Sequence, residues 1–374
     1  MAELTTSKQR MEWIDALRGF TMILVVAYHI CNMGFEEEIK TSASLPILVL
    51  FRMPLFFFIS GFLAYKPDFV WTGHRFGMMV WKKVKIQLLP TIVFLLVAIV
   101  VRESSFEKGF NTSMASPTKG GYWFTWVLLW MFIIYYLFSY LEMKMKKKSW
   151  VPIIILWLVA LAVYATVFMP KWFNYAFGSK EERPAFYNYT CLIQLMQYFH
   201  LFLFGNIVHR YWNKFQKLLD SNWFMPVLLV VTFIACADFL KWHNFKYQWT
   251  NLPRTVSMYS LMLIVFMFFR YYKDSFTKDK KIGAFLQYIG VRTLDIYLLH
   301  FLFLPHLRFV GDFFENQKNN FVLEVTVQIL AAILVIAFCI VISNTIRISP
   351  ILKKLLFGRE TKKKDKALQA EKKD

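Results

Sequence analysis

The chain has 374 residues, of which 57% are hydrophobic, 19% aromatic and only 18% charged, whereas a soluble domain carries about 25% charged residues. Together with a mean hydropathy of +0.42, this composition excludes an ordinary soluble domain and predicts a polytopic membrane protein. The net charge of +20 does not indicate a nucleic-acid partner, because the basic residues stand in short runs between apolar segments, as in cytoplasmic loops.

Ten segments are long and apolar enough to cross a bilayer, which takes about 20 mostly apolar residues. The third segment is the shortest. The predicted fold class is therefore all-α: a polytopic membrane bundle of about ten transmembrane helices, formed by residues 1–350 as one domain. We expect these helices near residues 14–33, 45–65, 86–102, 122–141, 150–169, 190–208, 223–240, 254–272, 284–305 and 321–346.

The distribution of Lys and Arg predicts the orientation. Basic loops follow the second, fourth, sixth and eighth segments, and the tail, residues 351–374, is basic as well. The loops after the first and third segments, which contain "FEEEIK" and "SSFEKGFNTSMASPTKGG", are predicted to be external. The positive-inside rule then places both termini in the cytoplasm of a protein of the cell (inner) membrane. The tail is expected to be disordered and to lie on the anionic inner leaflet.

The cysteines give no sign of a disulfide framework or of a zinc site. They are isolated, lie in or at the ends of apolar segments, and lack any CxxC or Cys/His ligand spacing. We therefore expect no bound metal. Residues 1–13 are polar and mixed in charge, unlike the start of a cleaved signal peptide, so the first apolar segment is expected to be a retained span. The four cysteines are Cys31, Cys191, Cys236 and Cys339.

The first segment carries Arg18 and His29, eleven residues apart. A helix turns about 100° and rises about 1.5 Å per residue, so the two side chains share one face and lie about 16 Å apart in depth. Arg18 would lie near the cytoplasmic side, either lining a groove or reaching the inner headgroups, with Asp15 as an i, i+3 partner. His29 would lie in the outer half, where a titratable group indicates function. A structural hydrogen bond to another helix is the alternative.

Two further segments place charged groups at a similar depth. Arg52 in "FRMPLFFFISGFLAY" falls in the outer half, facing a polar cavity or a carboxylate unless it extends to the outer headgroups. In "GVRTLDIYLLHFLFLP", Asp295 falls near mid-membrane and His300 in the outer half, and Arg292 could neutralise Asp295 at i, i+3. Three such groups from three helices, those of His29, Arg52 and His300, predict a polar chamber that opens outward.

The loop before the third segment, "WKKVKIQLLP", places Lys82, Lys83 and Lys85 at the cytoplasmic surface. These lysines are either ordinary positive-inside charge or a patch for an anionic ligand such as nucleotide phosphates. Near the inner end of the second segment stands the pair Ser60–Gly61. Small residues of this kind allow close helix packing without any chemistry.

Over nearly the whole chain, these stretches resemble the acyltransferase-3 family of multi-pass membrane acyltransferases. The most specific element is an arginine followed, after ten residues, by a histidine, here Arg18 and His29. The family often has an arginine-rich motif before the third span, where this chain has "KKVK"; lysine keeps the charge but lacks the bidentate fork of arginine. Further resembling stretches are "IDALRGF" (14–20), "FFFISGF" (56–62), "FHLFLFGNIV" (199–208) and "GVRTLDIYLLH" (290–300).

The resemblance implies transfer of an acyl group, by default acetyl, from a cytoplasmic donor, acetyl-CoA or another acyl-CoA. The acceptor would be a hydroxyl of a cell-surface glycan or a lipid-linked sugar, and no metal would take part. On this interpretation His29 is the general base and Arg18 holds the donor's phosphates or pantetheine arm. Arg52 orients acceptor oxygens or stabilises the oxyanion, and His300 assists or only hydrogen-bonds. Lys82, Lys83 and Lys85 are further candidates for donor binding.

Two other classes of function remain open at this point. A transporter or flippase for a glycan or organic anion would also carry charges inside its bundle, although the sequence shows no inverted repeat. A structural subunit of a polysaccharide-export machine is the third possibility, but it would not require His29 and His300 within spans.

Overall fold

The computed structural model describes residues 11–145, 150–167, 184–241, 251–316 and 320–357. This part of the chain is helical and contains no strand, as expected for a chain whose backbone polar groups must be satisfied within a bilayer. The longer helices are α1 (Glu12–His29), α2 (Leu45–Ala64), α3 (Gly73–Lys83), α4 (Leu89–Arg102), α5 (Phe106–Ala115), α6 (Trp123–Lys144), α7 (Val151–Val167), α10 (Leu192–Arg210), α12 (Phe224–Lys241), α13 (Asn251–Tyr271), α14 (Lys281–Gly290) and α17 (Phe321–Ile346).

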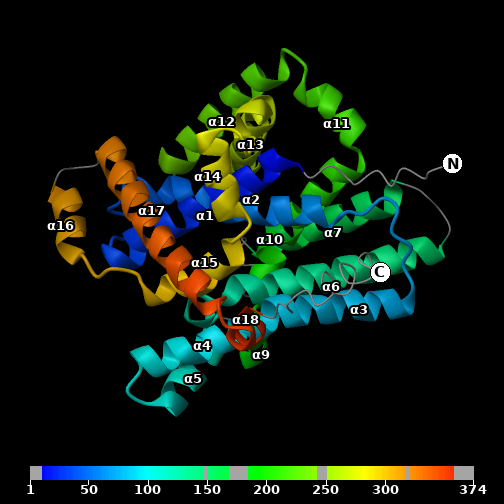
Figure 1. Ribbon diagram of the computed structural model, residues 1–374. Coiled ribbons are helices and arrows are strands. Elements are labelled where there is room, and N and C mark those ends of the chain that lie inside the picture. Colours follow the sequence, from blue (N-terminus) through cyan, green and yellow to red (C-terminus); the bar gives the residue numbers. More distant parts are fainter. Residues whose placement is uncertain (1–10, 146–149, 168–183, 242–250, 317–319, 358–374) are drawn as a thin grey trace, which may run out of the picture.

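Short helices connect and flank these elements (Figure 1). They are the π-turns η1 (Ile30–Gly34) and η2 (Val84–Leu88), the 3₁₀ turns η3 (Lys119–Gly121), η5 (Lys273–Phe276) and η6 (His300–Leu302), and the helices α9 (Ala185–Thr190), α11 (Trp212–Leu219), α15 (Thr293–Leu299), α16 (Arg308–Asn316) and α18 (Pro350–Phe357).

Within the described residues, six helices are long and apolar enough to cross a membrane, and up to eight if each of two bent helix pairs counts as one span. Each of the ten predicted segments overlaps a helix, but α7 and α10 do not meet this criterion. The all-helical, multi-pass class is therefore confirmed. The count of ten spans and the cytoplasmic position of both termini remain predictions.

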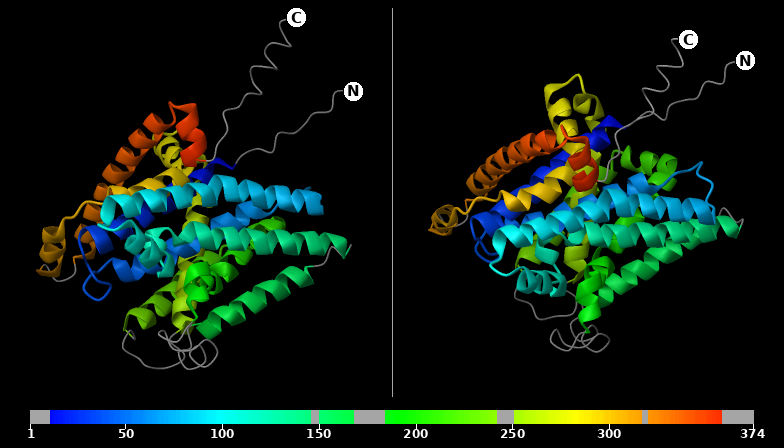
Figure 2. Two further views of the ribbon diagram at one scale, coloured as in Figure 1. Left: turned by 90° about the horizontal axis from the view of Figure 1, so that it is seen from below. Right: turned by 60° about the horizontal axis from the view of Figure 1, so that its bottom comes forward.

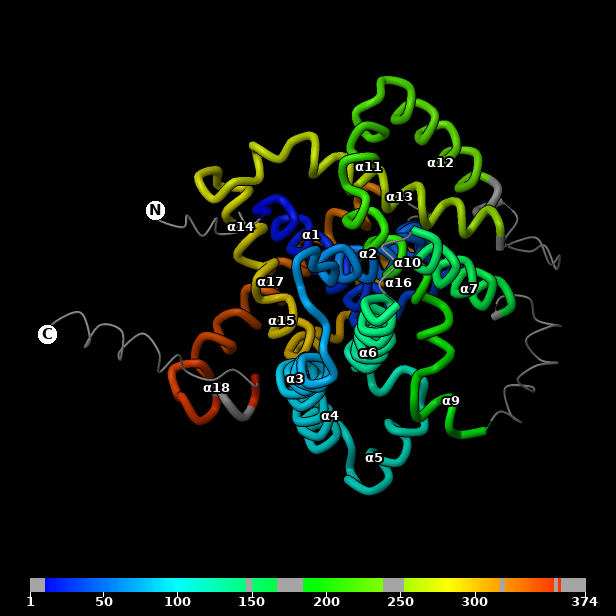
Figure 3. The backbone as a smooth tube through the Cα atoms, turned by 90° about the vertical axis from the view of Figure 1, so that its right-hand side faces the viewer, coloured from blue at the N-terminus to red at the C-terminus, as the bar shows by residue number. Residues whose placement is uncertain are grey.

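The helix α1 lies at the centre of the bundle, where it packs against α2, α13, α14, α15 and α17. Figure 3 shows α2 and α10 side by side near the middle, with α12 and α13 to one side and α3, α4 and α6 to the other. Glycines permit the closest crossings: a Cβ on Gly19 would lie 1.9 Å from the Leu286 carbonyl oxygen, and one on Gly61 would lie 1.7 Å from that of Phe202. The packing role predicted for the small pair at Ser60–Gly61 thus holds for Gly61.

The segment of Lys82, Lys83 and Lys85 is not a loop, which corrects the sequence interpretation. The helices α3 and α4 form one continuous helix, Gly73–Arg102, through the π-turn η2, and it runs beside α6 (Figure 2). The chain has no proline between residues 73 and 89. Pro90 stands in the first turn of α4, where the shifted hydrogen bonding of a π-turn tolerates its missing N–H. The lysines therefore have fixed positions on a helix.

The ninth predicted segment is broken rather than straight. The helices α14 and α15 meet at 62°, and Arg292 at the break has non-helical backbone angles, φ −110° and ψ 11°. The i, i+3 geometry expected for Arg292 and Asp295 is therefore lost. Arg292 lies over the Tyr288 ring, 3.8 Å from its centroid, while Asp295 pairs with Arg347, the residue that follows α17.

The tail predicted from residue 351 begins with the helix α18. Its last residue, Phe357, is fully buried and its ring lies 6.0 Å from that of Phe94 in α4. Burial of an aromatic ring supplies the stabilisation that a short isolated helix lacks. Residues 358–374 lie outside the described part of the chain.

Candidate active site

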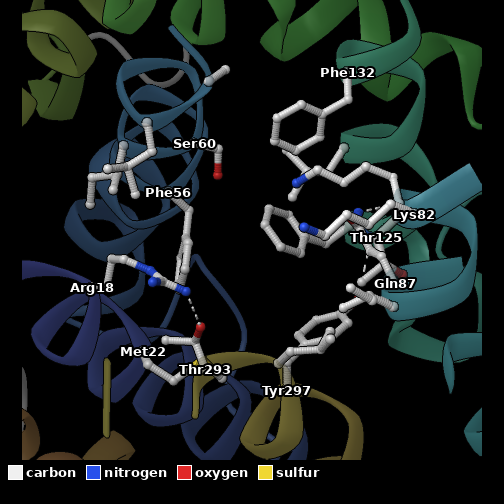
Figure 4. A pocket seen from close by; sticks show the side chains of 18 of the residues that line it. Arg18, Met22, Phe56, Ser60, Lys82, Gln87, Thr125, Phe132, Thr293 and Tyr297 are labelled. Carbon is white, nitrogen blue, oxygen red and sulfur yellow. Dashed lines mark hydrogen bonds between the residues drawn. The ribbon is translucent and has the colours of Figure 1, made fainter. Parts of the chain in front are cut away.

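A cavity of about 430 Å³ lies between α1, α2, α3, α6 and α15. Figure 4 shows Arg18, Phe56 and Ser60 on one wall, Lys82 and Phe132 on the opposite wall, and Thr293 and Tyr297 along the floor. Among the residues that line it, the cations are Arg18, Lys66, Lys82 and Lys83, and no carboxylate belongs to the lining. A concave surface with this composition attracts anions.

His29 lies on the same face of α1 as the residues that line this cavity. Arg18, Met22 and Val25 line the cavity at positions i, i+4 and i+7, and His29 follows at i+11 on the same face. The shared face predicted from the spacing of Arg18 and His29 is thus present. His29 itself lies one helical turn beyond the last α1 residue that lines the cavity.

Arg18 is held at the cavity wall rather than turned toward a bilayer surface. Its Nη2 donates a hydrogen bond to Thr293 Oγ1 at 2.9 Å (Figure 4). Its Nη1 lies 3.4 Å from Asp15 Oδ1, the partner expected from the i, i+3 spacing. The side chain keeps 28% of its surface exposed. Two partners therefore orient the guanidinium while part of it remains open to a ligand.

The three candidate lysines differ in position. Lys82 and Lys83 line the cavity, and the Lys83 ammonium lies 3.4 Å from the centroid of the Phe132 ring. This contact fixes the position of the Lys83 side chain against α6. Lys85 is exposed and does not line the cavity. Lys66, just after α2, is a cavity cation that the sequence analysis missed.

Beyond the cavity, the structure brings together the three groups predicted to share one depth. The rings of His29 and His300 lie 5.3 Å apart, and Phe301 packs against His29 at 4.8 Å. The Arg52 guanidinium lies 3.4 Å from the centroid of the Tyr28 ring, which itself lies 5.3 Å from the His29 ring. None of these three groups lines the cavity described above, and the outward-opening chamber remains a prediction.

Each of the three groups carries a buried nitrogen without a hydrogen-bond partner: His29 Nδ1, Arg52 Nε and His300 Nε2. His300 Nδ1 lies 2.9 Å from the Tyr297 carbonyl oxygen and 3.1 Å from that of Ile296, so Nδ1 donates. In a neutral ring Nε2 then carries the lone pair. Buried polar atoms are rarely left unpaired, and three in one cluster indicate a place for a substrate's polar atoms.

Tyr297 lies between the cavity and the cluster of His29, Arg52 and His300. It lines the cavity, and its ring lies 5.9 Å from that of His300. Its hydroxyl donates to the Gly121 carbonyl oxygen at 2.7 Å and accepts from the Phe124 amide at 3.3 Å. A signal was available in the sequence, because Thr293, Tyr297 and His300 follow one another at i, i+4 and i+7, which is one helical face.

Gln87 and Thr125 are further polar groups of the cavity that the sequence analysis missed. Gln87 Nε2 donates to the Thr125 carbonyl oxygen at 2.8 Å. Thr91 also contributes, because its hydroxyl donates to Thr125 Oγ1 at 2.9 Å. These bonds hold α6 against the η2–α4 segment, and therefore keep one wall of the cavity in place.

The fold and the site define a multi-pass membrane protein with a cation-lined cavity and, one helical turn of α1 beyond it, a pair of histidines. A family model described as an acyltransferase domain, Acyl_transf_3, matches residues 11–344. The chain belongs to this acyltransferase family, and its class of activity is acyl transfer at a membrane to a sugar or similar acceptor. The match includes α1 to α17 almost entirely, and with them every candidate site residue. Comparison with curated proteins and with solved structures found no match.

Proposed function

We propose that this protein transfers an acyl group, with acetyl as the first candidate, from cytoplasmic acyl-CoA to a hydroxyl of a cell-surface glycan, an exopolysaccharide or a lipid-linked sugar. One observation carries the proposal: the cation-lined cavity and His29 share one face of α1, and His29 stands one turn beyond the cavity. An anionic donor held at Arg18 would thus extend toward a base at His29.

The cavity fits the donor's chemistry in two ways. Its cations, Arg18, Lys66, Lys82 and Lys83, are suited to phosphate groups. Its other walls are largely apolar, with Met22 and Phe56 among them, and suit an extended arm with a thioester at its tip. Ser60, Gln87 and Thr293 also line the cavity and offer hydroxyl and amide groups to the polar atoms of that arm.

In the proposed reaction, His29 removes the proton from the acceptor hydroxyl, and the oxygen attacks the thioester carbonyl carbon. The C–S bond of the resulting tetrahedral intermediate breaks, the ester remains on the acceptor, and the coenzyme A thiolate recovers the proton from His29. Arg52 stabilises the oxyanion of the intermediate or orients acceptor oxygens. His300, whose Nε2 is unpaired, accepts a hydrogen bond from the acceptor.

The test is acyl transfer by the purified protein in liposomes, with radiolabelled acetyl-CoA and a cell-envelope glycan extract. We expect label in the glycan with the wild type and with Lys85→Ala, and none with His29→Ala. Arg18→Ala should transfer only at high donor concentration. Normal transfer by His29→Ala would overturn its role as base. Absence of transfer by a folded wild type with several acyl donors, together with flux of unmodified glycan into liposomes, would favour the transporter.

A further inference from the structure

A second cluster of reactive side chains lies apart from the cavity, near the C-terminal end of α1, which is predicted to be the outer end. Cys31 in the π-turn η1, Glu37 in the following loop and Glu324 in the first turn of α17 are all buried. A sulfur or carboxylate oxygen from each lies within 4.8 Å of the other two. Glu324 lies 293 residues from Cys31 in the sequence, so no ligand spacing could reveal the set of three.

The Glu324 carboxylate is held firmly by its neighbours. Its oxygens accept hydrogen bonds from the Ala43 amide at 2.9 Å, the Ser44 hydroxyl at 2.6 Å and the Gln328 amide at 3.0 Å. The Ser42 hydroxyl donates to the same group. Metal-binding carboxylates are typically oriented by such outer hydrogen bonds. Glu324 is therefore fixed in place, with its Oε1 3.9 Å from Cys31 Sγ.

The Glu37 carboxylate, in contrast, is buried with one of its two oxygens unpaired. Only 7% of its surface is exposed, and its Oε1 has no hydrogen-bond partner. Within the described residues, neither Glu37 nor Glu324 forms an ion pair with Lys or Arg. Two buried carboxylates this close require a shared proton or a bound cation.

An acidic pocket gives access to this cluster. It has a volume of about 380 Å³ and lies between the loop after η1 and the helix α16. Arg308, its basic residue, is exposed and lies 3.8 Å from Glu36 and 3.9 Å from Asp312. The excess of carboxylates concentrates cations at the mouth. The carboxylates that line the pocket are those of Glu36, Glu37, Glu38, Asp312 and Glu315.

We propose that Cys31, Glu37 and Glu324 bind a divalent metal ion of the zinc class. One thiolate and two carboxylates are a donor set that zinc accepts, and three protein ligands leave a fourth position for water. Tetrahedral zinc places a sulfur and an oxygen ligand about 3.6 Å apart. Cys31 Sγ lies 3.9 Å from Glu324 Oε1, so only a small adjustment is needed. The thiol proton is released when the metal binds.

The site would join two elements that frame the candidate active site. Cys31 stands two residues after His29, in the π-turn that ends the first span, and Glu324 begins α17, which packs against α1. A metal at this position would tie the outer end of α1 to α17. The inference does not depend on the proposed acyl donor or acceptor.

The experiment measures metal directly, in the full-length protein purified with added zinc and then freed of loosely bound ions. We expect about one zinc per chain by mass spectrometry in the wild type. Cys31→Ser and Glu37→Gln should retain little, whereas Glu38→Gln, which removes the same charge from an exposed neighbour, should retain the wild-type amount. Gel filtration and thermal unfolding would show that the variants are folded.

A cobalt titration makes the test independent of the variants. If Cys31 is a ligand, Co²⁺ added to the wild type should produce a thiolate-to-cobalt charge-transfer band, and Zn²⁺ should abolish it. Absence of both zinc and the cobalt band in folded wild-type protein would overturn the proposal and would show that a shared proton balances the two carboxylates. Equal metal loss in Glu38→Gln and Glu37→Gln would also overturn it, because binding would then be at the acidic surface.

Discussion

At the scale of single residues, His29 and the cavity cations should affect different kinetic constants. General base catalysis contributes about 10²–10⁴-fold in rate, so His29→Gln should lower kcat by that factor and leave the KM for the donor nearly unchanged. Steady-state kinetics with acyl-CoA would measure both constants. His74→Gln is a suitable control, because His74 is exposed on α3 and does not line the cavity. A His29→Gln enzyme with normal kcat would contradict the proposed base.

Lys83 and Lys85 provide a matched pair for donor binding. Both stand on the same continuous helix, but Lys83 lines the cavity and Lys85 is exposed. A bond to a charged group contributes about 1.5–3 kcal/mol, so Lys83→Met should raise the donor KM by about tenfold or more, and Lys85→Met should not. Equal effects of the two substitutions on KM would show that general surface charge, rather than the cavity, attracts the donor.

Whether the neighbours of a residue could be predicted depends on how far apart the interacting residues are in the sequence. Arg18 and His29 share a face because helical periodicity relates residues within one segment, and this was readable from the sequence. The partner of Asp295 was not readable, because Arg347 lies 52 residues away and only the packing of α15 against α17 brings them together. The proximity of Glu324 to Cys31 was unreadable for the same reason, because 293 residues separate them.

At the scale of elements, glycines at the points where helices cross determine how closely those helices pack. Gly61→Ala in α2 should destabilise the protein by about 1–3 kcal/mol, because the added methyl group would lie 1.7 Å from the Phe202 carbonyl oxygen. Gly77→Ala in α3 should be neutral or stabilising, because nothing lies within 4 Å and alanine favours helix. Thermal unfolding in detergent compares the two. A neutral Gly61→Ala would mean that α2 and α10 pack less closely than described.

The two arginines near the break between α14 and α15 should differ in their contribution to stability. Arg347 pairs with Asp295, a residue only 1% exposed, whereas Arg292 lies over an aromatic ring at the break. Removing one partner of a buried ion pair costs about 3–5 kcal/mol, so Arg347→Ala should lower the free energy of unfolding far more than Arg292→Ala. If Arg292→Ala lowered the unfolding temperature more than Arg347→Ala, Asp295 would pair with Arg292, as the i, i+3 spacing suggested.

Element boundaries show where sequence reasoning succeeds and where it stops. The apolar segments located helices correctly because hydrophobic length is a strong signal. The same reasoning placed the lysines of "KKVK" in a loop, because charge interrupts the apolar run. The structure continues the helix through them, since Lys83 rests on the Phe132 ring and a π-turn tolerates Pro90. Tertiary contacts of this kind are invisible to a hydropathy pattern.

At the scale of the whole molecule, the orientation in the bilayer decides which side supplies each substrate. The cavity lies beside Arg18, near the N-terminal end of α1, and beside Lys66, just after the C-terminal end of α2. The distribution of Lys and Arg predicts that this end of the bundle faces the cytoplasm, where acyl-CoA is found. The two histidines and the acidic pocket then lie toward the opposite side, from which a glycan acceptor would approach.

Reporter fusions test this arrangement in intact cells. A fluorescent protein joined to the N-terminus or after residue 374 should fold and fluoresce, because both ends are predicted to be cytoplasmic. Alkaline phosphatase joined after Ser116, between α5 and η3, should be active, because that loop is predicted to be external. An inactive fusion at Ser116 together with an external C-terminus would show that the bundle has the opposite orientation in the membrane. Since the cavity would then open away from the cytoplasm, that outcome would exclude cytoplasmic acyl-CoA as the donor even if acyl transfer itself were confirmed.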